Sequence, residues 1–291
     1  GAASTGARAM TSSSSPGISL KQEGISFLAG FELPAVIINV MRGGPGLGNI
    51  APAQGDYFQA TRGGGPGDYR TPVFAPASVQ EIADLTFKSF DVADRYRTPV
   101  MILGDGMMGQ MKEPVVFPEQ VSSLAEKEWA LKGRGDGPSR YMASLILNAV
   151  EMERHNWKLN RKYQEIEKNE VMYEEYMMED AKILVIAYGT TARIAKGAIK
   201  RVRMDGVPVG LLRPITLWPF PTKIIREICE KVDSVIVFEM STGQMLEDVA
   251  LAVEGRRRIQ FHGRPGGVVP TPVEFARIIY REYQLNKKSA K

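Results

Sequence analysis

The chain alternates between continuous apolar runs and segments in which apolar residues recur every three or four positions. Continuous runs of this kind are typical of strands that are buried on both faces of a sheet. The segments between them have the spacing of amphipathic helices. Strands that alternate with helices predict an α/β fold with a parallel sheet. The expected buried strands are 34–40, 99–103, 183–187, 207–212 and 234–238.

Shorter patterns predict the remaining elements. Ser78 and Glu81 match a capping box, so we expect a helix to begin there with Ile82 and Phe90 on one face. Residues 151–178 predict one long or broken helix, whose apolar stripe suits docking against a neighbouring domain. Weaker strands are expected at 8–14, 73–75 and 259–261, and further helices at 18–27, 223–231 and 243–253, after 189 and after 271.

These elements divide the chain into two units, as its length also favours. The first unit is expected to span 1–120 and the second 181–291, with a connector and the long helix over 121–180. The second unit has a full alternation of strands and helices, so we expect it to be complete within the chain.

The segment between Val40 and Val73 has no clear element, although segments of this length inside a domain are usually functional or disordered. Its aromatic residues argue against disorder. It follows the carboxyl end of a buried strand, where open α/β sheets bind their ligands. Arg42 is the first charge after that strand, and a guanidinium among glycines suits a carboxylate or a phosphate. In the alternative interpretation, Arg42 is structural and binds carbonyls of its own loop.

Two glycine-rich stretches in this segment, 43–48 and 63–67, are similar to phosphate-binding loops. Neither has the Lys-Ser/Thr ending that such a loop uses, and neither opens a helix cleanly. Pro45 and Pro66 each remove a backbone N–H that a phosphate cradle would need. We therefore do not expect a free-standing phosphate site here.

The composition narrows the class of protein. Lys and Arg total 37 against 33 Asp and Glu, and a net charge of +4 is too small to predict a nucleic-acid-binding protein. Hydrophobic residues make up 44% of the chain, which is typical of a folded domain. No apolar run approaches a membrane span and no secretory leader is evident, so we expect a cytoplasmic protein with no membrane partner.

The remaining candidate functional residues, taken one at a time, give little indication of a catalytic role. Cys229 is the only cysteine, which rules out an internal disulfide and a cluster held by this chain alone. Its helical surroundings predict a buried apolar role rather than a nucleophile. His262 has no Ser or Asp at a useful spacing. Glu239 follows a buried strand, where it either reaches a ligand or, as we favour, is bound by its own strand end.

Several stretches taken together identify a family. In order they are 10–24 (MTSSSSPGISLKQEG), 32–61 (ELPAVIINVMRGGPGLGNIAPAQGDYFQAT), 67–81 (GDYRTPVFAPASVQE), 186–193 (IAYGTTAR), 211–221 (LLRPITLWPFP) and 239–249 (EMSTGQMLEDV). This ordered set resembles the α-type subunit of 2-oxoacid:ferredoxin oxidoreductases. The similarity is greatest to the subunit of the branched-chain members that carries the thiamine-pyrimidine domain.

The resemblance implies a partial thiamine-diphosphate pyrimidine-binding domain followed by a transketolase C-terminal-like α/β domain. It implies an enzyme that oxidatively decarboxylates a 2-oxoacid, forms the acyl-CoA and passes electrons to ferredoxin. In such enzymes a partner chain binds the diphosphate and Mg²⁺, and cysteine-rich domains or chains hold the Fe–S clusters. The sequence agrees with this division of labour. Gly104-Asp105-Gly106 is similar to the start of the magnesium motif, but the Asn pair that should follow is missing.

The resemblance also implies roles for a few residues. Arg42 matches the arginine that binds the 2-oxoacid carboxylate, which the bidentate geometry of a guanidinium explains. Ser14, Ser15, Pro16 and Gly17 match the turn beside the cofactor pyrimidine. The family's catalytic glutamate, and the threonine that helps to hold the substrate, match positions upstream of Gly1. We therefore expect the sequence to be a truncated or fragmentary subunit with no catalytic residue of its own.

Two other classes of protein remain open. An E1 β-type chain of a lipoamide-linked 2-oxoacid dehydrogenase has the same two-domain plan, and a lipoyl-domain partner would favour it. A non-catalytic assembly scaffold would use the glycine-rich segment only to bind protein. The sequence also leaves open whether the substrate is a branched-chain 2-oxoacid or 2-oxoglutarate.

Overall fold

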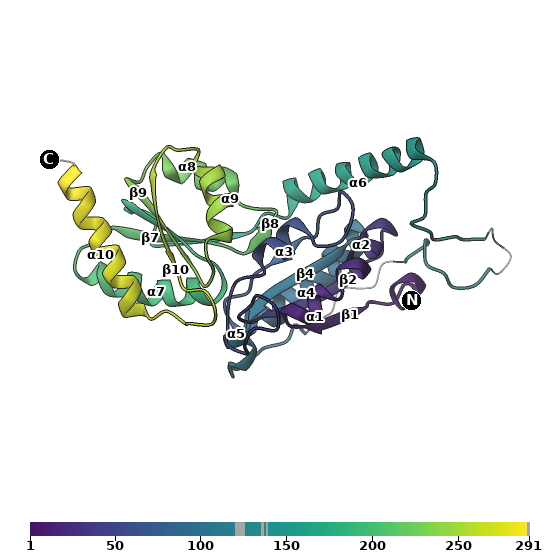
Figure 1. Ribbon diagram of the computed structural model, residues 1–291, viewed down its shortest axis with the longest axis horizontal. Coiled ribbons are helices and arrows are strands. Elements are labelled where there is room, and N and C mark those ends of the chain that lie inside the picture. Colours follow the sequence, from purple (N-terminus) through teal and green to yellow (C-terminus); the bar gives the residue numbers. More distant parts are fainter. Residues whose placement is uncertain (120–125, 135–136, 138, 290–291) are drawn as a thin grey trace.

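The computed structural model describes residues 1–119, 126–134, 137 and 139–289. These residues form two five-stranded sheets, each flanked by helices, that lie side by side and meet along the middle of the molecule (Figure 1). A short 3-10 helix, Ala3–Thr5, precedes the first strand. Among the described residues, no helix is long and apolar enough to span a membrane.

The first sheet has the strand order β1-β2-β4-β3-β8, in which only β8 is antiparallel to its neighbour. The last residue of β2, Met41, pairs with the last residue of β4, Asp105. Arg42 and the helix after Asp105 therefore leave the sheet at the same edge. The strands are β1 (Met10–Ser13), β2 (Ala35–Met41), β3 (Val73–Phe74), β4 (Pro99–Asp105) and β8 (Thr216–Trp218). The helices are α1 (Ser15–Ser19), α2 (Gln22–Gly30), α3 (Tyr57–Arg62), α4 (Val79–Tyr96) and α5 (Gly106–Gln110).

The second sheet has the order β10-β9-β6-β7-β5 and is parallel except for β5, which lies at one edge. Every residue of β6, β7 and β9 is buried, which explains their continuous apolar sequences. The strands are β5 (Tyr173–Tyr176), β6 (Ile183–Ile186), β7 (Val209–Pro214), β9 (Ser234–Glu239) and β10 (Arg258–Gly263). The helices of this unit are α7 (Gly189–Met204), α8 (Thr222–Cys229), α9 (Gln244–Val253) and α10 (Pro272–Ser289), whereas α6 (Ala149–Asn169) lies over the first unit (Figure 1).

The capping box before α4 shows how local sequence sets a helix start. The Ser78 hydroxyl accepts a hydrogen bond from the Glu81 amide at 3.1 Å, and the Glu81 carboxylate accepts one from the Ala77 amide at 2.8 Å. Two of the N–H groups at this end of the helix are thereby satisfied. The predicted boundary is confirmed.

The prediction of one long or broken helix over 151–178 holds as far as Asn169 and is wrong beyond it. The helix α6 ends at Asn169, and the chain then forms β5, which pairs with β7 in the second sheet. The apolar stripe does dock as predicted, since Leu159 and Tyr163 are buried. Exposed and half-buried positions alternate along β5, as in an edge strand, but its sequence Tyr-Glu-Glu-Tyr has no two-residue period, and Tyr173 continued the helical spacing by coincidence.

Three further differences concern short elements. The predicted helix 18–27 is divided into α1 and α2, and the segment 41–72 contains the six-residue helix α3. The strand β8 crosses from the second half of the chain into the first sheet, where it pairs with β3. Elements of three to six residues leave too few apolar positions for a period to be read.

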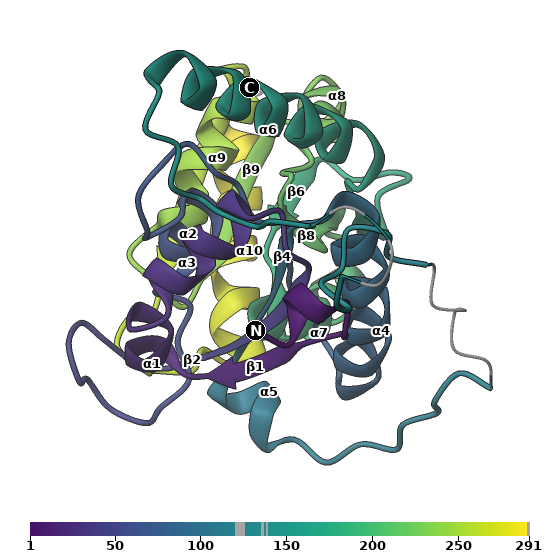
Figure 2. The same cartoon turned by 90° about the vertical axis from the view of Figure 1, so that its right-hand side faces the viewer.

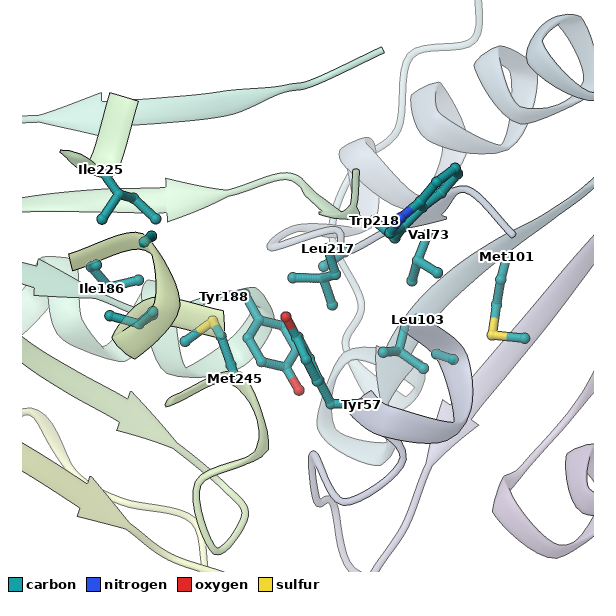
Figure 3. Close-up of a cluster of buried hydrophobic side chains, with 14 of the residues drawn as sticks. Tyr57, Val73, Met101, Leu103, Ile186, Tyr188, Leu217, Trp218, Ile225 and Met245 are labelled. Carbon is teal, nitrogen blue, oxygen red and sulfur yellow. The ribbon is translucent and has the colours of Figure 1, made fainter. Parts of the chain in front are cut away.

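A buried apolar cluster joins the two units (Figure 3). Tyr57 and Leu103 come from the first unit, and Tyr188 and Met245 from the second. The Tyr57 and Tyr188 rings lie 5.8 Å apart between centroids. Cys229 is buried in the same cluster, as its sequence position predicted. The two units therefore share one continuous core.

An ion-pair network around one buried arginine also links the units. Arg213 on β7 is 2% exposed, and its guanidinium makes two 2.8 Å hydrogen bonds to the Glu81 carboxylate at the start of α4. Its Nε donates to Glu174 on β5 at 2.7 Å. One side chain thus ties the second sheet to the first unit.

Exposed apolar residues concentrate in the connector. Residues 111–119 leave α5 and run outward from the body of the molecule (Figure 2). Phe117 is 66% exposed, and Tyr141 and Leu147, which precede α6, are 89% and 87% exposed. Large apolar side chains at this exposure are typical of surfaces that a partner covers.

Candidate functional site

The carboxyl ends of β1 and β2 face the segment that follows β9 across a cavity of about 550 Å³. Ser15 and Asp56 line it from the first unit, and Ser241 and Gln244 line it from the second. Gly44, in the glycine-rich loop, also lines the cavity. The position of that loop at the carboxyl end of a strand predicted that it would lie at a binding site. The cavity therefore lies at the junction of both units.

Asp56 is the centre of a hydrogen-bond network on one side of this cavity. Its carboxylate accepts a 2.6 Å hydrogen bond from the Ser15 hydroxyl and a 2.9 Å hydrogen bond from the Asn39 amide. The Ser15 oxygen in turn accepts a hydrogen bond from the Arg42 backbone N–H at 3.1 Å. Asn39 and Asp56 were not predicted, because a single polar residue in an apolar strand and an aspartate in a glycine-rich loop carry no sequence signal of their own.

The side chain of Arg42 has two different environments. Its Nη2 donates to the Leu47 carbonyl at 3.1 Å, which is the contact that the structural interpretation expected. Its Nε is buried and makes no hydrogen bond within the described part of the chain. Arg42 lies next to the cavity through its bond to Ser15 but is not part of the cavity wall.

The predicted turn at Ser14, Ser15, Pro16 and Gly17 forms the start of α1. Ser14 is the N-cap residue and Pro16 lies in the first turn, where its missing N–H does no harm. Only Ser15 and Pro16 of the four line the cavity. A Cβ at Gly17 would lie 1.9 Å from the Ser13 hydroxyl oxygen, so the glycine permits close packing of the helix against β1.

Gln54 fixes the glycine-rich segment to the second unit and was not found from the sequence. Its side chain is fully buried and donates to the Tyr188 carbonyl at 3.0 Å. Its carbonyl oxygen accepts a hydrogen bond from the Met240 amide at 2.9 Å and from the Thr191 hydroxyl at 3.3 Å. A glutamine with both halves of its amide satisfied has one allowed orientation.

A second glutamine repeats this arrangement from the other unit. Gln244 accepts a hydrogen bond from the Phe58 amide and donates to the Gly55 carbonyl. Tyr57 donates to Asp248 at 2.6 Å, and burial, reinforced by that carboxylate, raises the pKa of the tyrosine well above its usual value. The segment that carries Asp56 is therefore held between the two units.

We expect Gln54→Ala to lower the free energy of unfolding of the assembled enzyme by about 1–3 kcal/mol, because the Met240 amide loses its buried acceptor, whereas the Tyr188 carbonyl still accepts a hydrogen bond from the Thr191 hydroxyl. Thermal melting checks this value. Gln59→Ala serves as the control, because Gln59 lies in the same segment and its one side-chain hydrogen bond among the described residues is an exposed contact with the Ser19 hydroxyl. An equal change in both variants would contradict the assignment.

Two buried carboxylates at strand ends bind helix N-termini. Glu239 accepts hydrogen bonds from the Met245 and Leu246 amides, so the prediction of a carboxylate satisfied at its own strand end is confirmed. Asp105 accepts from the amides of the first turn of α5. Burial raises the pKa of both carboxyl groups, while these helix N–H groups act in the opposite direction. Gly104-Asp105-Gly106 is thus a strand-end turn.

His262 has a partner that its sequence surroundings do not reveal. Its Nε2 lies 2.7 Å from the Glu274 carboxylate at the start of α10. Glu274 is twelve residues away in sequence but adjacent across the end of β10. No group of three or more His, Cys, Asp or Glu side chains suited to a metal ion occurs among the described residues.

Solved structures define the class of fold. The chain is similar to a 2-oxoglutarate:ferredoxin oxidoreductase from Magnetococcus marinus, with a TM-score of 0.79 and 22% identity, over 97% of this chain and 54% of that chain. It is also similar to a split-gene transketolase, with a TM-score of 0.60 and 14% identity, over 98% of this chain and 78% of that chain. The two-unit α/β fold is therefore the one that these oxidoreductases share with transketolases.

Sequence comparison identifies the family. Residues 1–178 match the family described as pyruvate flavodoxin/ferredoxin oxidoreductase, thiamine diphosphate-binding, and residues 181–275 match the pyruvate:ferredoxin oxidoreductase core domain II. The chain belongs to this family of thiamine-diphosphate-binding 2-oxoacid oxidoreductases, which confirms the expected family and fold.

Two curated relatives are similar over most of the chain. The VorB subunit of ketoisovalerate oxidoreductase from Methanothermobacter marburgensis is 54% identical over 92% of this chain and 76% of the relative. The KorA subunit of 2-oxoglutarate synthase from Archaeoglobus fulgidus is 38% identical over 86% of this chain and 72% of the relative.

Proposed function

We propose that the chain is the pyrimidine-side subunit of an enzyme that oxidatively decarboxylates a branched-chain 2-oxoacid to its acyl-CoA and passes the electrons to ferredoxin. The observation that carries this proposal is the 54% identity to a subunit named for ketoisovalerate, against 38% or less to subunits named for 2-oxoglutarate. The difference favours a branched aliphatic substrate.

The residues that line the cavity support the aminopyrimidine ring of thiamine diphosphate as its ligand. Its wall contains hydroxyl, amide and backbone groups and the Asp56 carboxylate, but no Lys or Arg among the described residues. A diphosphate needs cations, so this wall suits the aminopyrimidine and not the diphosphate. The buried Asn39 Oδ1, which lacks a partner within the described residues, is an acceptor close to the same network.

When bound, thiamine diphosphate supplies the electron sink that loss of carbon dioxide from a 2-oxoacid requires. The residues of this chain bind and orient the cofactor pyrimidine and the substrate. Ser15 and Pro16 form the wall beside the pyrimidine, with Ser14 and Gly17 shaping the turn that presents them. Arg42 holds the substrate carboxylate with its free Nε and the adjacent Nη2, and for this it exchanges its bond to the Leu47 carbonyl.

The same proposal requires partner chains. We assign the diphosphate and its Mg²⁺ to a thiamine-binding partner subunit, and the Fe–S clusters to a ferredoxin-like partner, because the only cysteine of this chain is buried in its core. CoA and ferredoxin are then the acyl and electron acceptors. A free thiol in the core suits the reducing environment of the cytoplasm, where we place the enzyme.

The test is to co-express the chain with its partner subunits and to measure 2-oxoacid-dependent reduction of ferredoxin in the presence of CoA. We expect kcat/KM for 2-oxoisovalerate to exceed that for 2-oxoglutarate and for pyruvate by at least tenfold. A preference for 2-oxoglutarate would contradict the substrate assignment. Transfer of the acyl group to lipoamide in place of CoA, or a complex without any activity, would contradict the reaction itself.

A further inference from the structure

A second cavity, of about 970 Å³, is larger than the one beside Ser15 and shares no residue with it. It lies between α6 and the chain that leaves α3, on the side of the first unit that α6 covers (Figure 1). Trp218 and Tyr163 meet edge to face in its wall, with ring centroids 5.9 Å apart. Nothing in the proposed reaction uses this cavity.

Three carboxamides from α6 form one wall of the cavity. Asn156, Asn160 and Gln164 are spaced four residues apart, so they lie in a row along one face of the helix. None of the three side chains makes a hydrogen bond within the residues that the structure describes. The helix rises about 6 Å over four residues, while an extended chain advances about 6.6 Å over two. The row therefore matches alternate peptide groups of an extended polypeptide.

The opposite wall offers further peptide groups. Gly67 and Asp68 line it, and their backbone N–H and C=O groups take part in no hydrogen bond of the described chain. Both residues, together with Met152 and Asn156, also line an adjoining cavity of about 220 Å³ that reaches Phe27. The two cavities thus make one elongated groove, which fits an extended segment better than a compact ligand.

The charges in the groove argue against a nucleotide or another phosphate ligand. Arg62 is paired with Asp248 at 2.9 Å, and Arg70 donates to the Thr61 carbonyl. The groove also contains the carboxylates of Asp68, Glu153 and Glu167. A dianionic group would meet more acidic than basic side chains there.

The apolar residues around the groove indicate that a macromolecule covers it. Trp157 is 58% exposed on the groove wall, and Val150, two turns earlier on α6, is 54% exposed. Phe27 at the far end of the groove is 45% exposed. Aromatic residues and methionine, here Trp157, Phe27 and Met152, are enriched in protein–protein interfaces relative to the rest of the surface.

We propose that this groove binds an extended, largely uncharged polypeptide segment of a partner subunit. Its main chain bonds to Asn156, Asn160 and Gln164 on one side and to the backbone at Gly67 and Asp68 on the other. Trp157 and Met152 take its apolar side chains. The inference rests on the proposed function only in requiring that partner chains exist.

Site-specific photocrosslinking in the purified multi-subunit complex tests the occupant. The photoreactive amino acid p-benzoylphenylalanine is placed at position 160, inside the groove, or at position 161, which is exposed on the same helix but outside it. We expect position 160 alone to crosslink to one contiguous segment of a partner chain, identified by mass spectrometry. Crosslinks confined to this chain, or equal crosslinking from both positions, would overturn the proposal.

A second variant measures the carboxamides directly. We expect the triple change N156A/N160A/Q164A to weaken subunit association roughly tenfold or more, since three hydrogen bonds are lost. The helix should remain intact because alanine favours it. R161A/K168A is the control, because both side chains are exposed on α6 outside the groove. Unchanged subunit association in native mass spectrometry would refute the proposal that the groove binds a partner segment. Turnover of the 2-oxoacid, measured separately, tests only the proposed function.

Discussion

Replacing Arg42 with alanine should lower kcat/KM for the 2-oxoacid by roughly 100-fold or more, with the effect mainly on KM. A guanidinium that pairs with a carboxylate in a desolvated site contributes about 2–5 kcal/mol when it is truncated. Its Nε is buried and has no hydrogen-bond partner in the described chain, so this donor is available to the substrate carboxylate. Steady-state kinetics of the assembled enzyme measures the change.

Arg42→Lys separates the two interpretations of this residue. A lysine keeps the charge but loses the fork of donors, so we expect it to restore only a small part of the lost affinity. If Arg42 instead serves only the loop, through its bond to the Leu47 carbonyl, the alanine variant will melt at a lower temperature with an unchanged KM. Arg201→Ala is the matched control, because that arginine is exposed on α7. An unchanged KM in Arg42→Ala would end the substrate-binding proposal.

The fold could be predicted from the sequence wherever the burial of an element shows directly as a run of apolar residues. The strands β2, β4, β6 and β9 are buried on both faces, and their continuous apolar runs state this directly. The strand β8 is different, because its three residues are strand-like only through their antiparallel pairing with β3. Nothing local records a partner that lies more than 140 residues away.

The candidate site could be located but not assembled from the sequence. The position of Arg42 after a buried strand predicts the sheet edge at which the cavity lies. The residues that hold this region are a glutamine, Gln54, and an aspartate, Asp56, whose partners come from other segments. From the sequence, polar residues in a glycine-rich loop look like a solvated surface. Their burial becomes visible only when the second unit is placed beside them. Sequence patterns record burial against a sheet, not the pairing of two units.

The ion-pair network at Arg213 joins the two units through a buried guanidinium. We expect Arg213→Ala to lower the free energy of unfolding by about 2–4 kcal/mol, because the buried guanidinium loses three charge-assisted hydrogen bonds to Glu81 and Glu174, which are themselves about one-third exposed. For a chain of this size the melting temperature should fall by roughly 10 °C. Lys223→Ala is the control, since that side chain is 92% exposed and should change the melting temperature little.

The pH dependence of the free energy of unfolding of Arg213→Ala tests why this variant loses stability. Burial alone would raise the pKa of the Glu174 carboxyl, but its bonds to Lys196 and Arg213 outweigh burial and lower the pKa below its usual value. A lowered folded-state pKa contributes stability that is present above the ordinary pKa and is lost as the pH falls through the folded value. Acid should therefore narrow the difference between the wild-type protein and Arg213→Ala. A constant difference between neutral pH and pH values below the ordinary glutamate pKa would show that lost packing, and not the ion pair, sets the cost.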